Sequence, residues 1–238
     1  NSPFYNIIRF NPLTDLIIET KTKKTRKAIG FYSSFLDPAG TNKLVFDIGA
    51  NKGNKVKAFL KMGFKVISIG ADFDRLQKDL PAVIAEAKSY GAKYVVCFWI
   101  PHNGDEFTLE NAKNGIDVFN AAGKILSENG LSLCYHPHGY EFRPYEKGTL
   151  FDFIMSSVKA EWVNFEMDVF WIKNPGQDPV ALLKKYPTRW KMLHLKDRRI
   201  GTPNNLNGRQ DVETNVVLGT GDVGIAEIMK TAKKIGIQ

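Results

Sequence analysis

The sequence predicts an α/β protein built on a parallel (β/α) barrel, and three observations carry this prediction. Short apolar runs recur from residue 65 onward at intervals of 29, 37, 32 and 28 residues. The segments between the runs have the apolar spacing of amphipathic helices. Polar side chains gather where the runs end. A chain of 238 residues is long enough for one such barrel.

The predicted strands are nearly continuous apolar runs. They begin near Lys65, Tyr94, Leu131, Val163 and Lys191. Unbroken apolar character, in place of strict alternation, is typical of parallel strands that are covered on both faces. Each interval has room for one strand, one helix and two loops, so the chain reads as a series of β-α units.

Helical stripes fill the intervals between the predicted strands. Apolar residues repeat at i, i+3, i+4 and i+7 within residues 80–87, 112–126 and 150–158. Gly91 and Gly130 follow the first two stripes and predict where those helices stop.

Repeating β-α units fit either an open, doubly wound sheet or a barrel. The barrel is favoured by the polar residues at the strand ends, because a barrel brings those ends together on one face. An open sheet would spread them along an edge. These residues are Asp72, Asp74, His102, His136, His138, Glu141, Asp168, His194, Lys196 and Asp197.

Charge is distributed unevenly along the chain, which has a net charge of +8. The first 70 residues hold 12 Lys and Arg against 4 Asp and Glu, whereas the remainder is balanced. The basic stretch at residues 21–27 is predicted to be a solvated helix face, and no nucleic-acid partner is expected. The step in charge indicates that two kinds of sequence meet near residue 70.

No apolar run approaches the roughly 20 residues of a membrane-spanning helix, so no membrane partner is expected. The N-terminus does not have the pattern of a signal peptide. Cys97 and Cys134 lie inside apolar runs and are predicted to be buried thiols. Together these features predict a cytoplasmic protein.

The residues with the strongest chemical signal are His136, His138, Glu141, Asp168 and His194. Imidazole and carboxylate groups suit a divalent ion such as Mn, Zn, Co or Mg. A single histidine is more often structural, but five such groups at the ends of three consecutive strands favour a metal site.

A metal in this position would polarise the oxygens of a small sugar substrate. A nearby carboxylate or histidine, Glu141 or His138, would then move a proton at the carbon next to the carbonyl. Lys196 is the predicted electrostatic partner of the resulting enediolate. The alternative for Lys196 is a salt bridge with Asp197 or Glu166.

Four ordered motifs, in residues 134–142, 166–171, 193–197 and 218–224, resemble the sugar phosphate isomerase/epimerase family. This family belongs to the xylose isomerase-like TIM barrels, and the resemblance covers about residues 62–238. It implies a metal-dependent isomerase or epimerase that acts through an enediolate.

The resemblance also implies four metal ligands from different late strands. Asp168 and His194 match two of them. The third is His136 by strand position, with Glu141 as the carboxylate alternative. The fourth is a glutamate on a final strand, which is expected to begin at Ile237, and an enzyme without that strand would be impaired.

The loop at residues 219–224 satisfies the pattern G-x-G-x-x-G, which binds dinucleotides when it opens a series of β-α units. No such series follows here. The resemblance makes this segment a loop that precedes the last helix.

A different pattern precedes residue 70. An apolar run at residues 43–49 leads into spaced glycines, a helical stripe and the strand at residues 65–69, which together predict a β-α-β unit. Residues 3–69 resemble S-adenosylmethionine (SAM)-dependent methyltransferases of the FkbM type. The resemblance implies that SAM would be bound by Asp47, Gly49, Asn51 and Gly53.

We therefore expect a chimera of a methyltransferase-like segment, residues 1–69, and a barrel segment, residues 70–238, packed as one domain. Two alternatives stay open at this point: a SAM-dependent methyltransferase, and an inactive chimeric or engineered fold. An unclosed barrel would leave strand edges that can pair between copies, so an oligomer is compatible with the prediction.

Overall fold

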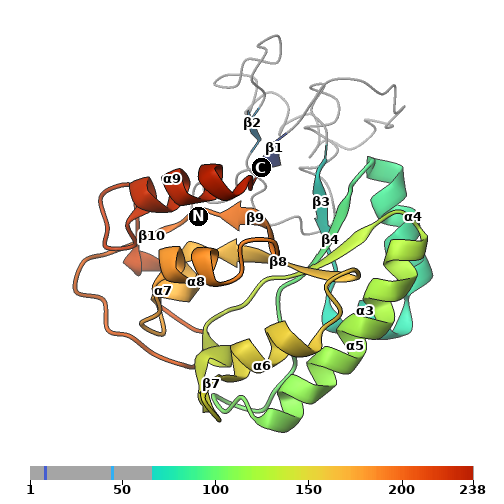
Figure 1. Cartoon of the computed structure of the whole chain (residues 1–238), viewed down its shortest axis with the longest axis horizontal. Coiled ribbons are helices and arrows are strands. Elements are labelled where there is room, and N and C mark those ends of the chain that lie inside the picture. Colours follow the sequence, from blue (N-terminus) through green and yellow to red (C-terminus); the bar gives the residue numbers. More distant parts are fainter. Residues whose placement is uncertain (1–7, 10–43, 46–65, 238) are drawn as a thin grey trace.

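The computed structural model describes residues 8–9, 44–45 and 66–237. Its centre is a parallel sheet in which each strand pairs with the next one along the chain (Figure 1). The five strands are β3 (Ser68–Gly70), β4 (Tyr94–Cys97), β5 (Ser132–Tyr135), β8 (Val163–Asp168) and β9 (Trp190–His194).

The strand order decides between the two architectures that the repeating β-α units allowed. A doubly wound sheet reverses its strand order at a switch point. In the described residues the order runs from β3 to β9 without reversal, so the sheet curls in one sense into a half-barrel. The parallel barrel prediction is confirmed to this extent.

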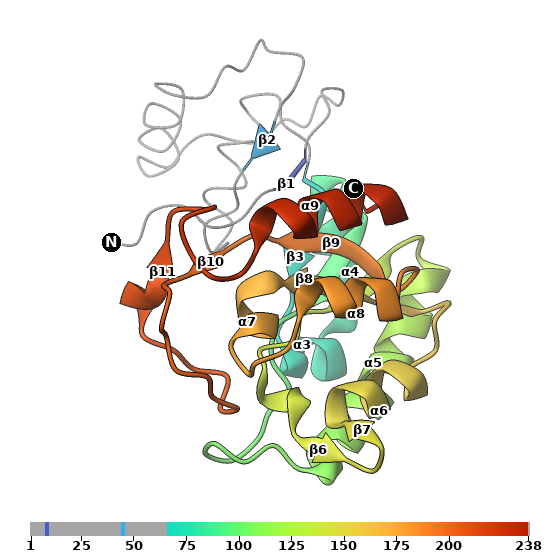
Figure 2. The same ribbon diagram turned by 60° about the vertical axis from the view of Figure 1, so that its left-hand side comes forward.

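The helices are arranged around the curled sheet (Figures 1 and 2). They are α3 (Phe73–Lys78), α4 (Leu80–Tyr90), α5 (Leu109–Glu128), α6 (Leu150–Ser157), α7 (Val169–Lys173), α8 (Pro179–Lys185) and α9 (Ile225–Ile235). Gly91 ends α4 in the left-handed conformation, as its position in the sequence predicted.

The core contains both the strands and the inner faces of the helices. Leu133 and Tyr135 of β5 and Phe165 of β8 are fully buried. Cys97 and Cys134 are buried free thiols, which confirms their predicted environment. Their burial raises the pKa of Cys97 to about 12, so this thiol is inert.

Three pairs of two-residue strands lie outside the main sheet. They are β1 (Ile8–Arg9) with β2 (Leu44–Val45), β6 (Pro144–Tyr145) with β7 (Gly148–Thr149), and β10 (Asp197–Arg198) with β11 (Asn215–Val216). Two short 3₁₀ turns, η2 (Tyr140–Phe142) and η3 (Val212–Thr214), complete the described elements.

The pairing of β2 gives the predicted β-α-β unit no support. In the described residues Leu44–Val45 pairs antiparallel with Ile8–Arg9, and the sheet that contains β3 does not include it. A local apolar pattern predicts a strand without specifying its partner. The rest of the methyltransferase-like segment lies outside the described residues, and the predicted boundary after residue 69, which falls inside β3, stays a prediction.

Asp152 ties the start of α6 to the end of α8. Its Oδ2 accepts hydrogen bonds from the Thr149 backbone N–H at 3.0 Å and from the Thr149 hydroxyl at 2.9 Å, which completes a capping box. Its Oδ1 accepts from Lys185 Nζ at 2.7 Å and from the Tyr186 hydroxyl at 2.5 Å. Burial alone would raise the pKa of Asp152, but these donors outweigh it and lower the pKa.

We expect Asp152→Ala to lower the free energy of unfolding by about 1–2 kcal/mol, because it removes the cap and both contacts with α8. The carboxylate has a lowered pKa in the folded state, so its stabilisation is complete above the unfolded pKa of about 3.9 and fades as the pH falls below it. Urea unfolding should show that the advantage of the wild type over Asp152→Asn shrinks between about pH 6 and about pH 3. Exposed Asp117→Asn is the control, and an advantage that persists at low pH would contradict the assignment.

Candidate metal centre

Three buried side chains meet at the C-terminal ends of adjacent strands. His136 follows β5 directly, Asp168 is the last residue of β8, and His194 is the last residue of β9. Asp168 and His194 are register partners in the sheet. Each residue offers a ligand atom, and within the described part of the chain these atoms all lie within 4.8 Å of one another. The curl of the sheet therefore creates the cluster, which we call the three-residue centre.

Asp168 is held rigidly between a helix and this centre. Its Oδ1 accepts hydrogen bonds from the backbone N–H groups of Phe170 at 3.0 Å and Trp171 at 3.2 Å, and so caps α7. Its Oδ2 lies 3.1 Å from His194 Nδ1 and 3.5 Å from His136 Nε2. The second oxygen is thus turned toward the two imidazoles.

The electrostatics of the centre favour an ionised Asp168 carboxylate beside a neutral His194 ring. Burial would raise the pKa of Asp168, but Lys196 and the two imidazoles outweigh burial and hold this pKa well below its usual range. Burial also lowers the pKa of His194 well below its usual value, so this ring is neutral. Neutral imidazole and ionised carboxylate are the forms that coordinate metals.

Two further features of the histidine rings indicate that a metal ion fits the centre. Among the described residues, the buried Nε2 atom of His194 has no hydrogen-bond partner. His136 Nδ1 lies 3.2 Å from Glu166 Oε2, a carboxylate contact that orients the ring as in many metal sites. Sequence reasoning assigned Glu166 only to Lys196, although its position two residues before Asp168 places both on one face of β8.

Glu141 does not belong to the three-residue centre. It is fully buried in η2, and its carboxylate accepts hydrogen bonds from the backbone N–H groups of Gly139 at 2.8 Å and His138 at 3.1 Å, and from the Tyr135 hydroxyl. Burial raises the pKa of Glu141. With both oxygens turned to these donors, Glu141 holds the loop that carries His138.

His138 lies beside the centre. Its ring centroid is 4.8 Å from that of His136, and the rings of Trp99 and Trp171 flank it at 5.6 Å and 5.2 Å. Burial, followed by the neighbouring His136, lowers the pKa of His138 to about 3. The Nδ1 atom is buried and lacks a hydrogen-bond partner in the described structure.

Lys196 is joined to the centre by an ion pair that the sequence did not indicate. Its Nζ lies 2.8 Å from Asp168 Oδ2, whereas the sequence analysis considered Asp197 or Glu166 as partners. The ammonium group also lies 5.8 Å from the ring centroid of Trp171. Of the predicted site residues, His136, Asp168 and His194 therefore meet in one cluster, and His138 and Lys196 border it.

Asp197 has a separate role, which explains the glycine-rich loop. Its Oδ2 accepts hydrogen bonds from the backbone N–H groups of Gly219 at 2.8 Å and Gly221 at 2.9 Å. Arg198, the next residue, forms a bidentate ion pair with Asp222 of the same loop, at 3.0 and 2.8 Å. The backbone cradle that could hold an anion thus holds the carboxylate of Asp197, in agreement with rejecting a dinucleotide site.

Gly221→Ala should lower the free energy of unfolding by about 2 kcal/mol or more, because an added Cβ would collide with the Arg198 carbonyl oxygen and the Asp197 carboxylate. Gly219→Ala is the matched control. Its Cβ would meet open space, so only the left-handed backbone costs energy, about 1 kcal/mol. Thermal unfolding of both variants checks the prediction, and equal losses would contradict it.

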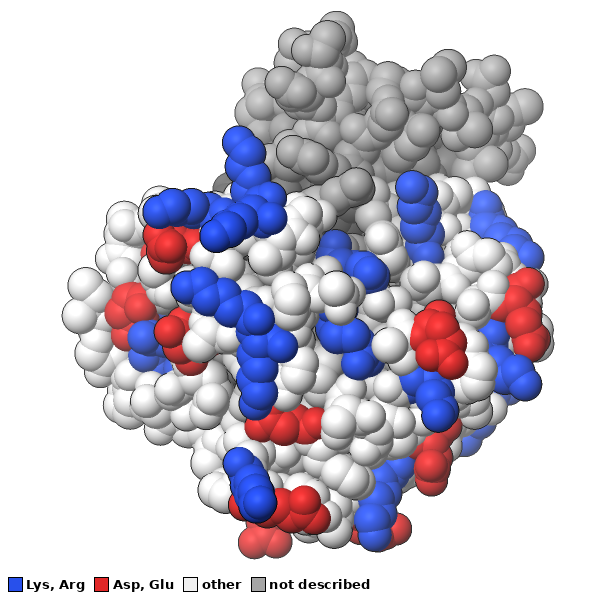
Figure 3. Space-filling view, in the orientation of Figure 1, with Lys and Arg blue, Asp and Glu red and all other residues white. Residues whose placement is uncertain are grey.

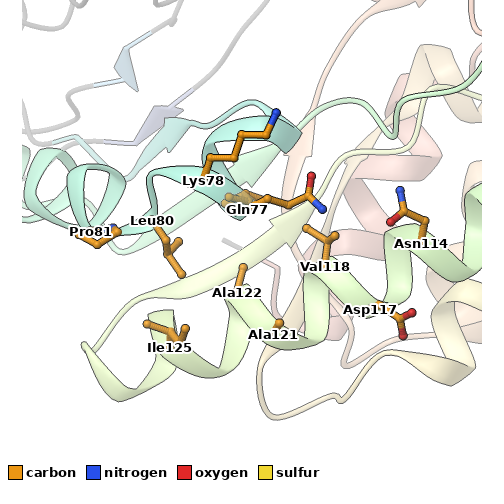
Figure 4. Close-up of a pocket in the computed structure, with 11 residues that line it drawn as sticks. Gln77, Lys78, Leu80, Pro81, Asn114, Asp117, Val118, Ala121, Ala122 and Ile125 are labelled. Atoms are coloured by element: carbon orange, nitrogen blue, oxygen red, sulfur yellow. The ribbon is translucent and has the colours of Figure 1, made fainter.

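Three features lie away from the centre: a surface groove, the distribution of charged side chains, and the character of the helices. A groove of about 490 Å³ between α3–α4 and α5 is lined by Leu80, Val118 and Ile125, among others, and shares no residue with the centre (Figure 4). Basic and acidic side chains are interspersed on the face shown in Figure 3. No described helix has the length and apolar character that crossing a membrane requires.

The candidate SAM-binding residues Asp47, Gly49, Asn51 and Gly53 lie outside the described residues. Comparisons with known proteins give no support to a methyltransferase-like segment at residues 3–69. The family match begins at residue 64, and the relatives and structures named below are not methyltransferases.

The curated relatives include inosose dehydratases. The protein from Clostridium beijerinckii is 28% identical over 140 residues, which are 58% of this chain and 41% of that protein. The one from Bacillus cereus strain AH820 is 29% identical over 133 residues, 53% of this chain and 44% of that protein. The chain thus spans about two fifths of the length of these relatives.

Solved structures agree on the fold. A sugar phosphate isomerase/epimerase from Parabacteroides distasonis superposes with a TM-score of 0.61 at 23% identity, over 81% of this chain and 71% of that chain. The IolI protein, whose crystal structure contains a zinc atom, superposes with a TM-score of 0.58 at 16% identity, over 73% and 65%.

The model of the xylose isomerase-like TIM barrel family matches residues 64–238, which is most of the chain. The match covers every strand of the curled sheet and all three residues of the centre. The chain therefore belongs to the xylose isomerase-like TIM barrel family.

Proposed function

We propose that the chain is a metal-dependent enzyme that removes the proton next to the carbonyl of a polyhydroxy ketone of the sugar or cyclitol class, and so forms an enediolate. The observation that carries this proposal is the three-residue centre itself, with ligand atoms of His136, Asp168 and His194 within 4.8 Å at the strand ends. Active sites of (β/α) barrels lie at this face.

His136, Asp168 and His194 are the residues that would hold the metal. Two imidazoles and one carboxylate form a donor set that suits zinc or manganese and leaves coordination positions open. A bound divalent ion would supply a Lewis acid for the carbonyl and hydroxyl oxygens of the substrate. Glu166 supports this arrangement by orienting the His136 ring at 3.2 Å.

The groups that border the centre would act on the substrate directly. We assign the proton-accepting atom to His138 Nδ1, because the ring lies 4.8 Å from that of His136 and this buried nitrogen has no hydrogen-bond partner in the part of the chain that the structure describes. Lys196 would stabilise the negative oxygen of the enediolate. Glu141 would position the His138 loop and would not take part in proton transfer.

Isomerisation, epimerisation and dehydration of such a ketone share this first proton removal, and the relatives include both inosose dehydratases and a sugar phosphate isomerase/epimerase. The test therefore measures the shared step. The zinc- or manganese-loaded chain is incubated in D₂O with inosose and with a panel of ketoses and ketose phosphates, and deuterium at the carbon next to the carbonyl is followed by NMR.

We expect exchange with at least one substrate, and the final product then distinguishes dehydration from isomerisation. Asp168→Asn and His138→Ala should abolish exchange, whereas His102→Ala should retain it, since His102 lies outside the centre. Absence of exchange with every substrate and both metals would refute the proposal.

A further inference from the structure

One oxygen atom at the centre contacts a lysine ammonium group and is also a candidate metal ligand. Asp168 Oδ2 lies 2.8 Å from the ammonium group of Lys196, and the same oxygen faces the imidazoles of His136 and His194, with which it would coordinate a metal ion. An ammonium group and a divalent ion at one carboxylate oxygen would repel each other strongly in a buried site.

The surroundings show which of these groups is able to move. Asp168 is fully buried, and its other oxygen is fixed by the N–H groups of Phe170 and Trp171. Lys196 has a long side chain that is 18% exposed, and the ring of Trp171 already lies 5.8 Å from its Nζ. The aromatic ring offers the ammonium group a second favourable position.

We infer that Lys196 is the counter-cation of the metal-free centre, and that a divalent ion displaces its ammonium group from Asp168 Oδ2. The displaced group then lies beside Trp171, where the substrate would bind. This inference rests on the proposed function, because it assumes that His136, Asp168 and His194 hold a metal. It gives Lys196 a second role beside the proposed stabilisation of the enediolate, because the ammonium group becomes free to meet the substrate only after the metal has bound.

The inference predicts that removal of the lysine charge strengthens metal binding. Binding of Zn²⁺ and of Mn²⁺ to the full chain is measured by isothermal titration calorimetry for the wild type, Lys196→Met and Lys196→Gln. Lys196→Gln keeps a hydrogen-bond donor for Asp168 and so protects the fold. The matched control is Lys191→Met, since Lys191 is on β9 and its Nζ donates a hydrogen bond to the Thr188 carbonyl oxygen at 3.2 Å, away from the three-residue centre.

Both Lys196 variants should bind metal roughly tenfold more tightly than the wild type, because the competing charge is gone. Lys191→Met should bind as the wild type does. Unchanged or weaker binding by Lys196→Gln would overturn the inference and would make Lys196 a support for the ligating carboxylate.

The outcomes also separate this inference from the proposed function. Metal binding by the wild type with no gain in the Lys196 variants refutes the inference alone. If neither the wild type nor the variants bind metal, both fail. Binding by the variants alone supports the inference in its strongest form.

A second measurement follows the ammonium group itself. Amine-reactive labelling with mass-spectrometric detection should show faster modification of Lys196 when zinc is added, because the ion pair with Asp168 is broken. Lys191 should be modified at the same rate with and without zinc. Slower or unchanged labelling of Lys196 on the zinc-loaded chain would contradict the displacement.

Discussion

Replacement of Glu141 by alanine is expected to lower the free energy of unfolding by about 3–5 kcal/mol. The carboxylate is fully buried and satisfies the N–H groups of His138 and Gly139 and the hydroxyl of Tyr135. Its removal leaves the N–H groups of His138 and Gly139 without their acceptor, leaves the Tyr135 hydroxyl with only the Tyr140 hydroxyl at 3.0 Å, and creates a cavity. Few single changes in the described chain remove so many buried hydrogen bonds at once.

Chemical denaturation of the metal-free chain measures this effect, with exposed Glu128→Ala as the control. Glu141→Gln gives a second comparison, because it keeps the shape but offers only one acceptor oxygen. If Glu141 were a metal ligand, this variant would lose metal affinity and keep much of its stability. The structure predicts the opposite: a clear loss of stability, and metal affinity close to that of the wild type in the molecules that remain folded.

Zinc affinity should fall on the order of 1,000-fold in His194→Ala and in Asp168→Asn, well beyond the 10- to 100-fold that loss of an outer-shell partner costs. Each change removes one of only three ligand atoms that the described centre offers. Glu166→Gln should lower zinc affinity by only about 10- to 100-fold, because Glu166 contacts the metal ligand His136 and would not contact the metal.

Calorimetry of zinc binding checks the series, and His102→Ala is the matched histidine control. His102 stacks on Trp99 with ring centroids 4.7 Å apart, and its Nδ1 bonds the Ile100 carbonyl oxygen at 2.8 Å. A loss of affinity in His102→Ala as large as that in His194→Ala would show that general destabilisation, and not ligand removal, weakens binding.

Much of the fold could be predicted because its signals are local. Apolar runs specified the five parallel strands, and the 3.6-residue spacing specified α4, α5 and α6. The step from β-α units to a barrel also succeeded, because polar residues at the ends of successive strands are informative only if those ends converge. His136, Asp168 and His194 were found in this way.

The remaining site contacts depend on tertiary placement, which the sequence pattern does not encode. Glu141 is close in sequence to His136 and His138, yet the η2 turn directs its carboxylate to backbone N–H groups. Lys196 lies next to Asp197 in the chain, but Asp197 is engaged by the glycine loop, and Lys196 pairs with Asp168 across the sheet.

The N-terminal prediction shows a related limit. A β-α-β pattern is common to many α/β folds, so the stretch before residue 70 resembled a methyltransferase without any test of its tertiary partners. The structure pairs Leu44–Val45 with Ile8–Arg9, and the family match extends to residue 64.

X-ray absorption at the zinc edge, on chain loaded with one equivalent of zinc and dialysed, tests the three-residue centre most directly. It reports which kinds of ligand atom bind the ion without any assumption about the substrate, and the His194→Ala variant assigns one of them. We predict one zinc ion per chain, with scattering from two imidazole rings and the rest of the coordination from oxygen, and loss of one imidazole in His194→Ala. Zinc that is bound without imidazole scattering, or lost entirely on dialysis, would contradict the assignment of His136, Asp168 and His194 as a metal centre.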